Sequence, residues 1–212
     1  MNRNLTACFV MAILAIVHPI GSALPDNEPA RPEGTPSLVV TALLEKTIFK
    51  VDVVSLELWL GPATTREVRR HLATGTDSLA TAIADSRDAW AQLVFQRDVN
   101  LDRFLAGVTE DMQRAVRAGL LDTAGYAKVT RGLPVWLEPL RAQGIASGDR
   151  FTYAIVNDTL RTVFTRQDGH VTIDQTDVGP AHRRALLGSF VAPGAGFRDD
   201  LLADLELKEK TP

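Results

Sequence analysis

Cysteine is almost absent from this chain of 212 residues, because the only one is Cys8, near the amino terminus. Basic residues are not in excess either, since 23 lysines and arginines stand against 26 acidic residues. These shortages argue against a disulfide-stapled protein, a cysteine-ligated metal site and a nucleic-acid-binding surface. The hydrophobic share of 45% is that of an ordinary globular protein with enough residues for one good core.

An apolar run from Leu5 to Val17 marks the amino terminus. Arg3 precedes this run and Gly21-Ser22-Ala23 follows it, which is the pattern of a secretory signal peptide. The run is shorter than the roughly 20 residues of a membrane span. We therefore expect cleavage after Ala23 and a bacterial periplasmic or secreted protein with no membrane span. The alternative is an uncleaved anchor.

The sequence after Ala23 divides into three parts. Residues 24–37 hold four prolines and read as a flexible lead-in. Residues 38–205 carry the strand and helix patterns and form a single expected domain. Residues 206–212 are expected to form a polar tail, and no internal repeat occurs.

Hydrophobic periodicity predicts an α+β domain. Strands are expected at Leu38–Leu44, Thr47–Leu60, Trp90–Arg97, Phe151–Ile155, Leu160–Thr165 and His170–Asp174, with a bend or bulge at Glu45-Lys46. Helices are expected at Thr64–Leu72, Asp77–Arg87, Asn100–Gly119, after Asp122, after Pro180 and at Asp199–Leu205, with Pro134 and Pro139 breaking the region around Trp136. This order favours a mostly antiparallel sheet covered on one face by helices.

Four short motifs within residues 38–205 resemble the chalcone isomerase-like family. They are Phe49-Lys50-Val51, Phe95-Gln96-Arg97-Asp98-Val99, Gly148-Asp149 and Ala185-Leu186-Leu187. The resemblance implies an open-faced antiparallel sheet with a helical layer and a ligand cleft between them. Plant members of that family isomerise chalcones to flavanones, related members bind fatty acids, and many exported bacterial members have no assigned reaction.

The chain departs from the family at the residues that hold the ligand. Aligned on Phe49-Lys50-Val51, Leu44 stands where active and fatty-acid-binding members carry an arginine, and Asp52 and Glu57 replace tyrosines. A carboxylate does not donate a hydrogen bond at neutral pH and repels an anion. We therefore expect a non-catalytic member, with no catalytic residue, that binds a small apolar or fatty-acid-like ligand.

Lys46, Lys50, Asp52 and Arg97 are the candidate ligand-binding residues. Lys46 would supply a point charge in place of the missing guanidinium. Lys50 and Asp52 are two positions apart, so a strand directs both to one face, as a cleft pair, an edge pair or a solvated pair. Arg97 either contacts ligand or pairs with Asp98 beside the strand end.

Other chemistry finds little support in the sequence. The histidines His71, His170 and His182 lack metal-binding spacing, so we expect surface or capping roles for them and no metal or other cofactor. Two alternatives stay open for function. One is an isomerase with a rewired site that uses Lys46, Lys50 or Asp52, and the other is an envelope interaction module.

Overall fold

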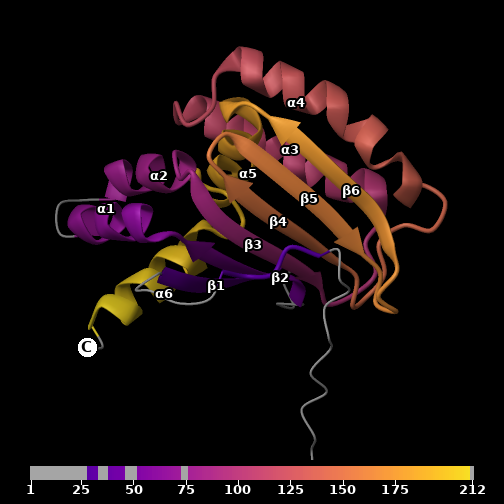
Figure 1. The fold of residues 1–212 in the computed structure, drawn as a ribbon, viewed down its shortest axis with the longest axis horizontal. Helices are drawn as coiled ribbons and strands as arrows, with labels where there is room; N and C mark the ends of the chain where they lie inside the picture. Colours follow the sequence, from indigo (N-terminus) through magenta and orange to yellow (C-terminus); the bar gives the residue numbers. More distant parts are fainter. Residues whose placement is uncertain (1–27, 33–37, 46–51, 73–75, 211–212) are drawn as a thin grey trace, which may run out of the picture.

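A computed structural model describes residues 28–32, 38–45, 52–72 and 76–210. Six strands form one sheet in the order β1-β2-β3-β4-β5-β6, each antiparallel to its neighbours (Figure 1). The strands are β1 (Leu38–Glu45), β2 (Asp52–Leu60), β3 (Asp88–Phe95), β4 (Arg150–Val156), β5 (Thr159–Thr165) and β6 (Val171–Val178). The predicted antiparallel sheet is therefore confirmed.

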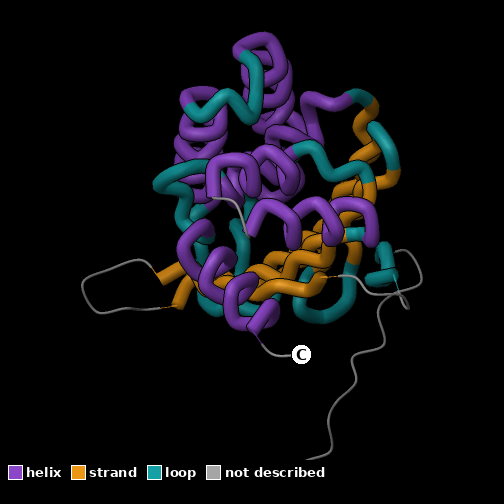
Figure 2. The backbone as a smooth tube through the Cα atoms, turned by 90° about the vertical axis from the view of Figure 1, so that its left-hand side faces the viewer, coloured by secondary structure: helices purple, strands orange, loops and turns teal. Residues whose placement is uncertain are grey.

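Helices lie together on one side of this curved sheet (Figure 2), except the last one, which runs along the edge strand β1. They are α1 (Pro62–Leu72), α2 (Thr76–Ala84), α3 (Leu101–Arg117), α4 (Thr123–Trp136), α5 (Pro180–Val191) and α6 (Arg198–Lys210), with the 3-10 turn η1 (Glu138–Leu140). In this layer, α5 occupies the middle and contacts α2, α3 and α4. The expected α+β class, an open sheet with a helical layer, is thereby confirmed.

Side chains alternate between the two faces of the sheet, as a pleated strand requires. On β4, Phe151, Tyr153 and Ile155 are buried toward the helices, and we call this side the inner face. Arg150 and Thr152 point to the opposite side, which we call the outer face. The inner face is apolar and forms the main core, whereas the outer face mixes polar and aromatic side chains.

Side chains cap the first turns of α3 and α4, the two helices that follow Asn100 and Asp122. Asn100 Oδ1 accepts hydrogen bonds from the backbone N–H groups of Asp102 and Arg103 at the start of α3. Asp122 Oδ1 accepts from Gly125 N–H at the start of α4. Such caps satisfy backbone donors that the first turn of a helix leaves unpaired.

The helix α6 covers the edge of the sheet rather than a face. Asp204 accepts a hydrogen bond from the backbone N–H of Thr41, and Asp200 accepts one from that of Leu43. Lys208 Nζ donates to the carbonyl oxygen of Val39. These bonds occupy groups of β1 that an exposed edge strand would leave open to another chain. The helix extends to Lys210, so residues 206–210 are helical, beyond the predicted end at Leu205.

One predicted boundary needs correction. Pro134 does not break the helix before Trp136, because α4 contains Pro134 and continues to Trp136. The described part of the long second strand begins at Asp52, and residues 46–51 lie outside the described residues. The expected irregularity beside Glu45 is present as a register shift between Leu44 and Glu45.

Candidate ligand cavity between sheet and helices

An apolar cavity of about 110 Å³ lies between the inner face and helices α3, α4 and α5, and we call it the inner cavity. Its lining is mainly aliphatic and aromatic: Phe104, Val108, Met112, Val129, Leu133, Trp136, Leu137, Phe151, Leu160, Ile173, Ala185, Leu186 and Phe190. An apolar cavity of about 150 Å³ takes up benzene in another protein. The inner cavity therefore suits an apolar group close to the size of one ring.

Stacked aromatic rings form the wall of this cavity at the sheet. The Phe151 ring stacks on Phe104 at 5.5 Å between centroids and on Tyr153 at 5.9 Å. Phe95 and Phe164 contact the same Phe151 ring from either side. Because Phe151 is almost completely buried, this cluster fixes the positions of Phe104 and Tyr153 at the cavity.

Tyr153 is the polar group of the cavity that lacks a protein partner. Its side chain is buried and lines the cavity, and its hydroxyl has no hydrogen-bond partner among the described residues. Burial raises the pKa of the Tyr153 hydroxyl above its usual range, so the group stays protonated. Among the described residues no completely buried side-chain nitrogen or oxygen lacks a partner, so the Tyr153 hydroxyl oxygen keeps accessible surface, which faces the cavity. A ligand or a water molecule inside the cavity would satisfy it.

A histidine and a carboxylate lie side by side at the polar end of the cavity. His182 Nδ1 is 3.8 Å from Asp177 Oδ1, and the His182 ring contacts Trp136. Burial lowers the pKa of His182; Asp177 raises it and Lys128 lowers it further, so the net shift is downward. The imidazole is therefore neutral near pH 7. The expected surface position of His182 is wrong, because its side chain is only 4% exposed.

Charge in the inner cavity is therefore negative. Asp177 lines it, and no lysine or arginine does among the residues that the structure describes. Gln175 Nε2 donates a hydrogen bond of 3.3 Å to Asp177 Oδ1. An anionic head group would be repelled at this end, whereas a neutral donor or acceptor would not.

A second and more open space of about 630 Å³ adjoins the inner cavity, and we call it the arginine-lined hollow. Arg97, Arg103 and Arg114 line it together with the carboxylates of Asp98, Glu110 and Asp111, at the ends of β1, β2 and β3 and along α3. Phe104 and Val108 line both spaces, so one layer of side chains separates them. A ligand that displaces this layer would have its apolar part inside and its polar end near the arginines.

Leu44, the residue that replaces the family arginine, also lines the arginine-lined hollow. Of the arginines that line this hollow, the sequence names Arg97 as a candidate but not Arg103 or Arg114. Arg103 and Arg114 lie on α3, and Arg97 follows β3. Arg114 already pairs with Glu110 and Asp111, which reduces its availability to a ligand.

The four predicted site residues are only partly placed. Lys46 and Lys50 lie outside the described residues. Asp52 begins β2, where its backbone pairs with Glu45, but its side chain is not described. Arg97 is exposed and lines the arginine-lined hollow, and its neighbour Asp98 accepts a hydrogen bond from Ser147 N–H. Their ligand-binding role stays a prediction.

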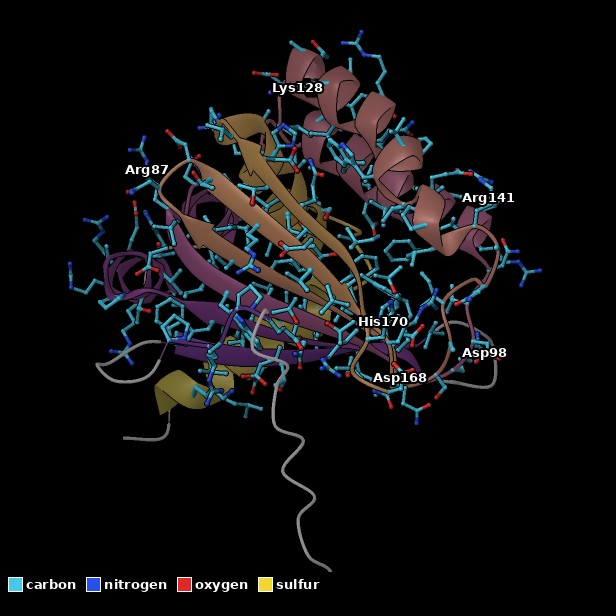
Figure 3. The ribbon with its side chains drawn as sticks, turned by 45° about the vertical axis from the view of Figure 1, so that its right-hand side comes forward. Arg87, Asp98, Lys128, Arg141, Asp168 and His170 are labelled. Atoms are coloured by element: carbon cyan, nitrogen blue, oxygen red, sulfur yellow. The ribbon has the colours of Figure 1, made fainter. Side chains whose placement is uncertain are left out.

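Figure 3 shows how the ends of the sheet are arranged around these residues. Asp98, Asp168 and His170 lie at one end, which is also the end of Arg97, and Arg87 lies at the other. Lys128 lies out among the helices, away from that end, whereas Arg141 lines a surface pocket together with Asp98. The arginine-lined hollow therefore opens near the Asp98 end of the sheet, and Arg87 is a distant cation of the same type.

Sequence reasoning missed Tyr153, Asp177 and His182 as site residues. Tyr153 belongs to the alternating pattern of its strand, which shows burial but not that a cavity lies above it. Asp177 lies on β6 and His182 in the first turn of α5, across the turn at Gly179, so their proximity depends on that turn. A cavity arises where side chains fail to fill space, and no local pattern reports that.

The described residues form neither a metal-binding cluster nor a helix that could span a membrane. No cluster of three or more histidine, cysteine, aspartate or glutamate side chains there is suited to hold a metal ion. No helix there has the length and apolar character needed to cross a membrane.

No protein-family model and no curated protein matches the chain. Among solved structures, the chain is similar to a fatty-acid binding protein of Arabidopsis thaliana, with a TM-score of 0.54 and 11% sequence identity. The match covers 85% of this chain and 89% of the plant protein. At this identity the likeness concerns the fold alone. It confirms the expected fold class, an α+β chalcone isomerase-like sheet with a helical layer on one face.

Proposed function

We propose that the protein is exported, loses residues 1–23, and binds a small apolar or fatty-acid-like ligand between sheet and helices without isomerising chalcones. The apolar inner cavity with the unpartnered Tyr153 hydroxyl carries this proposal. Ligand sites are typically concave, mostly apolar, and carry a few polar groups that orient the ligand. The fold shared with a plant fatty-acid binding protein supports the same ligand class.

The size of the inner cavity limits how the ligand binds. Pockets that enclose a drug-sized molecule usually measure about 300–1,000 Å³, and the inner cavity has about 110 Å³. A ring or a short chain fits there. A longer ligand extends past Phe104 and Val108 into the arginine-lined hollow, where a carboxylate end would pair with Arg97, because Arg114 is already paired with Glu110 and Asp111.

Titration calorimetry with octanoate and with 1-octanol tests this arrangement. Both ligands are expected to bind, and Arg97→Met is expected to weaken octanoate severalfold while leaving 1-octanol unchanged. Arg87→Met, at the opposite end of the sheet, is the matched control and should alter neither ligand. Absence of binding by both ligands, together with native mass spectra free of bound lipid, would reject the ligand-binding function.

A second candidate function is an isomerisation reaction inside the same cavity. The observation that favours it is the neutral His182 beside Asp177, because such a histidine is suited to accept a proton. Chalcone turnover that disappears in His182→Gln would establish this reaction. Undetectable turnover across a panel of chalcones would exclude it and leave ligand binding as the function.

A further inference from the structure

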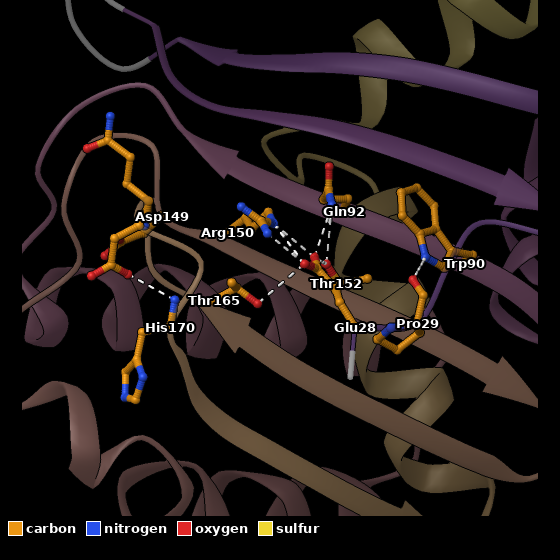
Figure 4. Close-up of polar contacts among 11 residues, drawn as sticks. Glu28, Pro29, Trp90, Gln92, Asp149, Arg150, Thr152, Thr165 and His170 are labelled. Carbon is orange, nitrogen blue, oxygen red and sulfur yellow. Dashed lines mark hydrogen bonds and ion pairs between the residues drawn. The ribbon is translucent and has the colours of Figure 1, made fainter. Parts of the chain in front are cut away.

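The outer face of the sheet carries a buried carboxylate contact that the inner cavity does not involve. Glu28 lies across this face, far from β4 in sequence, and its side chain is fully buried there. Arg150 Nε lies 2.9 Å from Glu28 Oε1, and Arg150 Nη2 lies 2.7 Å from Oε2 (Figure 4). This is the two-bond geometry with which arginine recognises a carboxylate most strongly.

Three strands supply the other donors. Thr152 Oγ1 donates to Glu28, Gln92 Nε2 donates at 3.3 Å, and Thr165 Oγ1 lies 3.5 Å from Glu28 Oε2. The sheet register places Gln92 opposite Thr152 and Thr165 opposite Arg150. Directly opposed residues share a face of an antiparallel pair, so the register itself assembles this site.

The recognition extends beyond the carboxylate along the same segment. Trp90 Nε1 donates a 2.8 Å hydrogen bond to the carbonyl oxygen of Pro29, and Arg31 forms an ion pair with Glu57 of β2. The sheet therefore contacts Glu28, Pro29 and Arg31 in turn. An incidental contact of a chain end would not place matched partners at three successive points.

We propose that this outer-face site, formed by Arg150, Thr152, Gln92, Thr165, Trp90 and Glu57, is a receptor for an extended peptide of the type Glu-Pro-x-Arg. Residues Glu28–Pro32 of the same chain are its resident ligand. The proposal rests on the outer face alone and is independent of the inner cavity. It assigns a specific occupant to the face that the helices leave uncovered.

Tethering explains why the chain occupies its own receptor. Only five residues separate Pro32 from Leu38, the first residue of β1. A short tether gives an effective concentration of about millimolar, so a free peptide competes poorly with it. Removal of the Glu28 carboxylate should release the segment and leave the Arg150 guanidinium available to a peptide in solution.

The test uses the full chain with Glu28→Ala and a synthetic peptide of residues 24–37, with tryptophan fluorescence as the readout because Trp90 lies in the site. The Glu28→Ala chain is expected to bind this peptide at least tenfold more tightly than the wild-type chain does. A peptide carrying Glu28→Gln should bind at least tenfold more weakly. Arg161→Met, on the same face but paired with Asp174, is the control for general loss of charge.

Three outcomes would overturn the proposal. They are no binding of the peptide to the Glu28→Ala chain, equal binding of the Gln peptide, and undiminished binding after Arg150→Met in the Glu28→Ala background. Light scattering measures the oligomeric state and so distinguishes a segment of the same chain from a segment of a second copy. A wild-type dimer that Glu28→Ala dissociates would assign the segment to a second copy and contradict occupation by the same chain. Circular dichroism verifies that each variant is folded.

Discussion

Phe151 and Tyr153 on β4 point into the helical layer, whereas their chain neighbours Arg150 and Thr152 point to the opposite side and bind Glu28. The inner face is stabilised by apolar burial and ring stacking, which do not depend on pH. Contacts to Glu28 on the outer face depend on one ionised carboxylate. The inner face consequently holds the fold together and leaves a space for a ligand, and the outer face holds one short segment.

The largest loss of stability is expected from a substitution in the core of the inner face. Phe151→Ala removes a fully buried ring that contacts Phe95, Phe104, Tyr153 and Phe164. We expect the free energy of unfolding to fall by about 3–5 kcal/mol in urea denaturation. Arg161→Ala, which loses an exposed ion pair on the outer face, should cost about 0–1 kcal/mol. Similar losses for the two variants would contradict the difference between the faces.

A smaller loss of stability is expected at Phe104, which separates the inner cavity from the arginine-lined hollow. Phe104→Ala should join the inner cavity to the arginine-lined hollow, at a cost of about 3 kcal/mol in unfolding free energy. Because the enlarged space admits a longer chain, dodecanoate should gain affinity relative to octanoate in calorimetry. An unchanged ratio of the two affinities would show that Phe104 does not separate the spaces for a ligand.

The outer face is expected to lose stability in acid. Burial raises the pKa of Glu28, but hydrogen bonds from Arg150 and Thr152 and the charge of Arg150 outweigh burial, so the pKa lies below its ordinary value. Because the pKa of Glu28 is lower in the folded chain than in the unfolded chain, the ionised carboxylate contributes its full stabilisation at pH values above the unfolded-chain pKa of Glu28. This stabilisation is lost as the pH falls through the lower pKa of the folded chain.

Glu28→Gln isolates this contribution. We expect it to reduce the free energy of unfolding by about 1–3 kcal/mol at pH 7. The difference in free energy of unfolding between wild type and the Glu28→Gln variant should shrink as the pH falls below about 5. Asp174→Asn, which removes a different outer-face carboxylate, is the control. A gap for Glu28→Gln that stays constant from pH 7 to pH 3 would contradict an ionised Glu28.

The smallest effect on stability should come from Tyr153→Phe. Its hydroxyl has no partner among the described residues, so removing it should change the free energy of unfolding by less than about 0.5 kcal/mol. Affinity for 1-octanol should nevertheless fall, since the ligand loses its hydrogen-bond partner. A large loss of stability would mean that the hydroxyl has a structural role instead.

The sequence predicts the fold better than the site, for physical reasons. Alternation in Phe151, Tyr153 and Ile155 and the stripe of α3 report which side chains are buried, and burial determines the layers. The site depends on long-range juxtapositions such as His182 with Asp177. The contact of Glu28 with Arg150 could not be predicted, because a proline-rich segment reads as unstructured until its partner on the sheet is known.

The family resemblance places Leu44 where members carry an arginine, and the sequence offers Lys46, Lys50 and Arg97 as candidate cations. Of these, Arg97 lines the hollow in the structure, together with Arg103 and Arg114 from α3, and all three come from elements other than β1. A substitution in one strand can be offset by residues distant in sequence, which only the three-dimensional arrangement reveals.

The central claim is that ligand binds in the inner cavity, and the most direct test is to fill that cavity with a larger side chain and measure ligand binding. Ala185→Leu places a larger side chain in the cavity, and Ala154→Leu makes the same change on the opposite face of the sheet. Calorimetric titration with 1-octanol should show binding to wild type and to Ala154→Leu, and a loss of at least tenfold in Ala185→Leu. Equal binding by all three proteins would contradict a ligand site between the sheet and the helices.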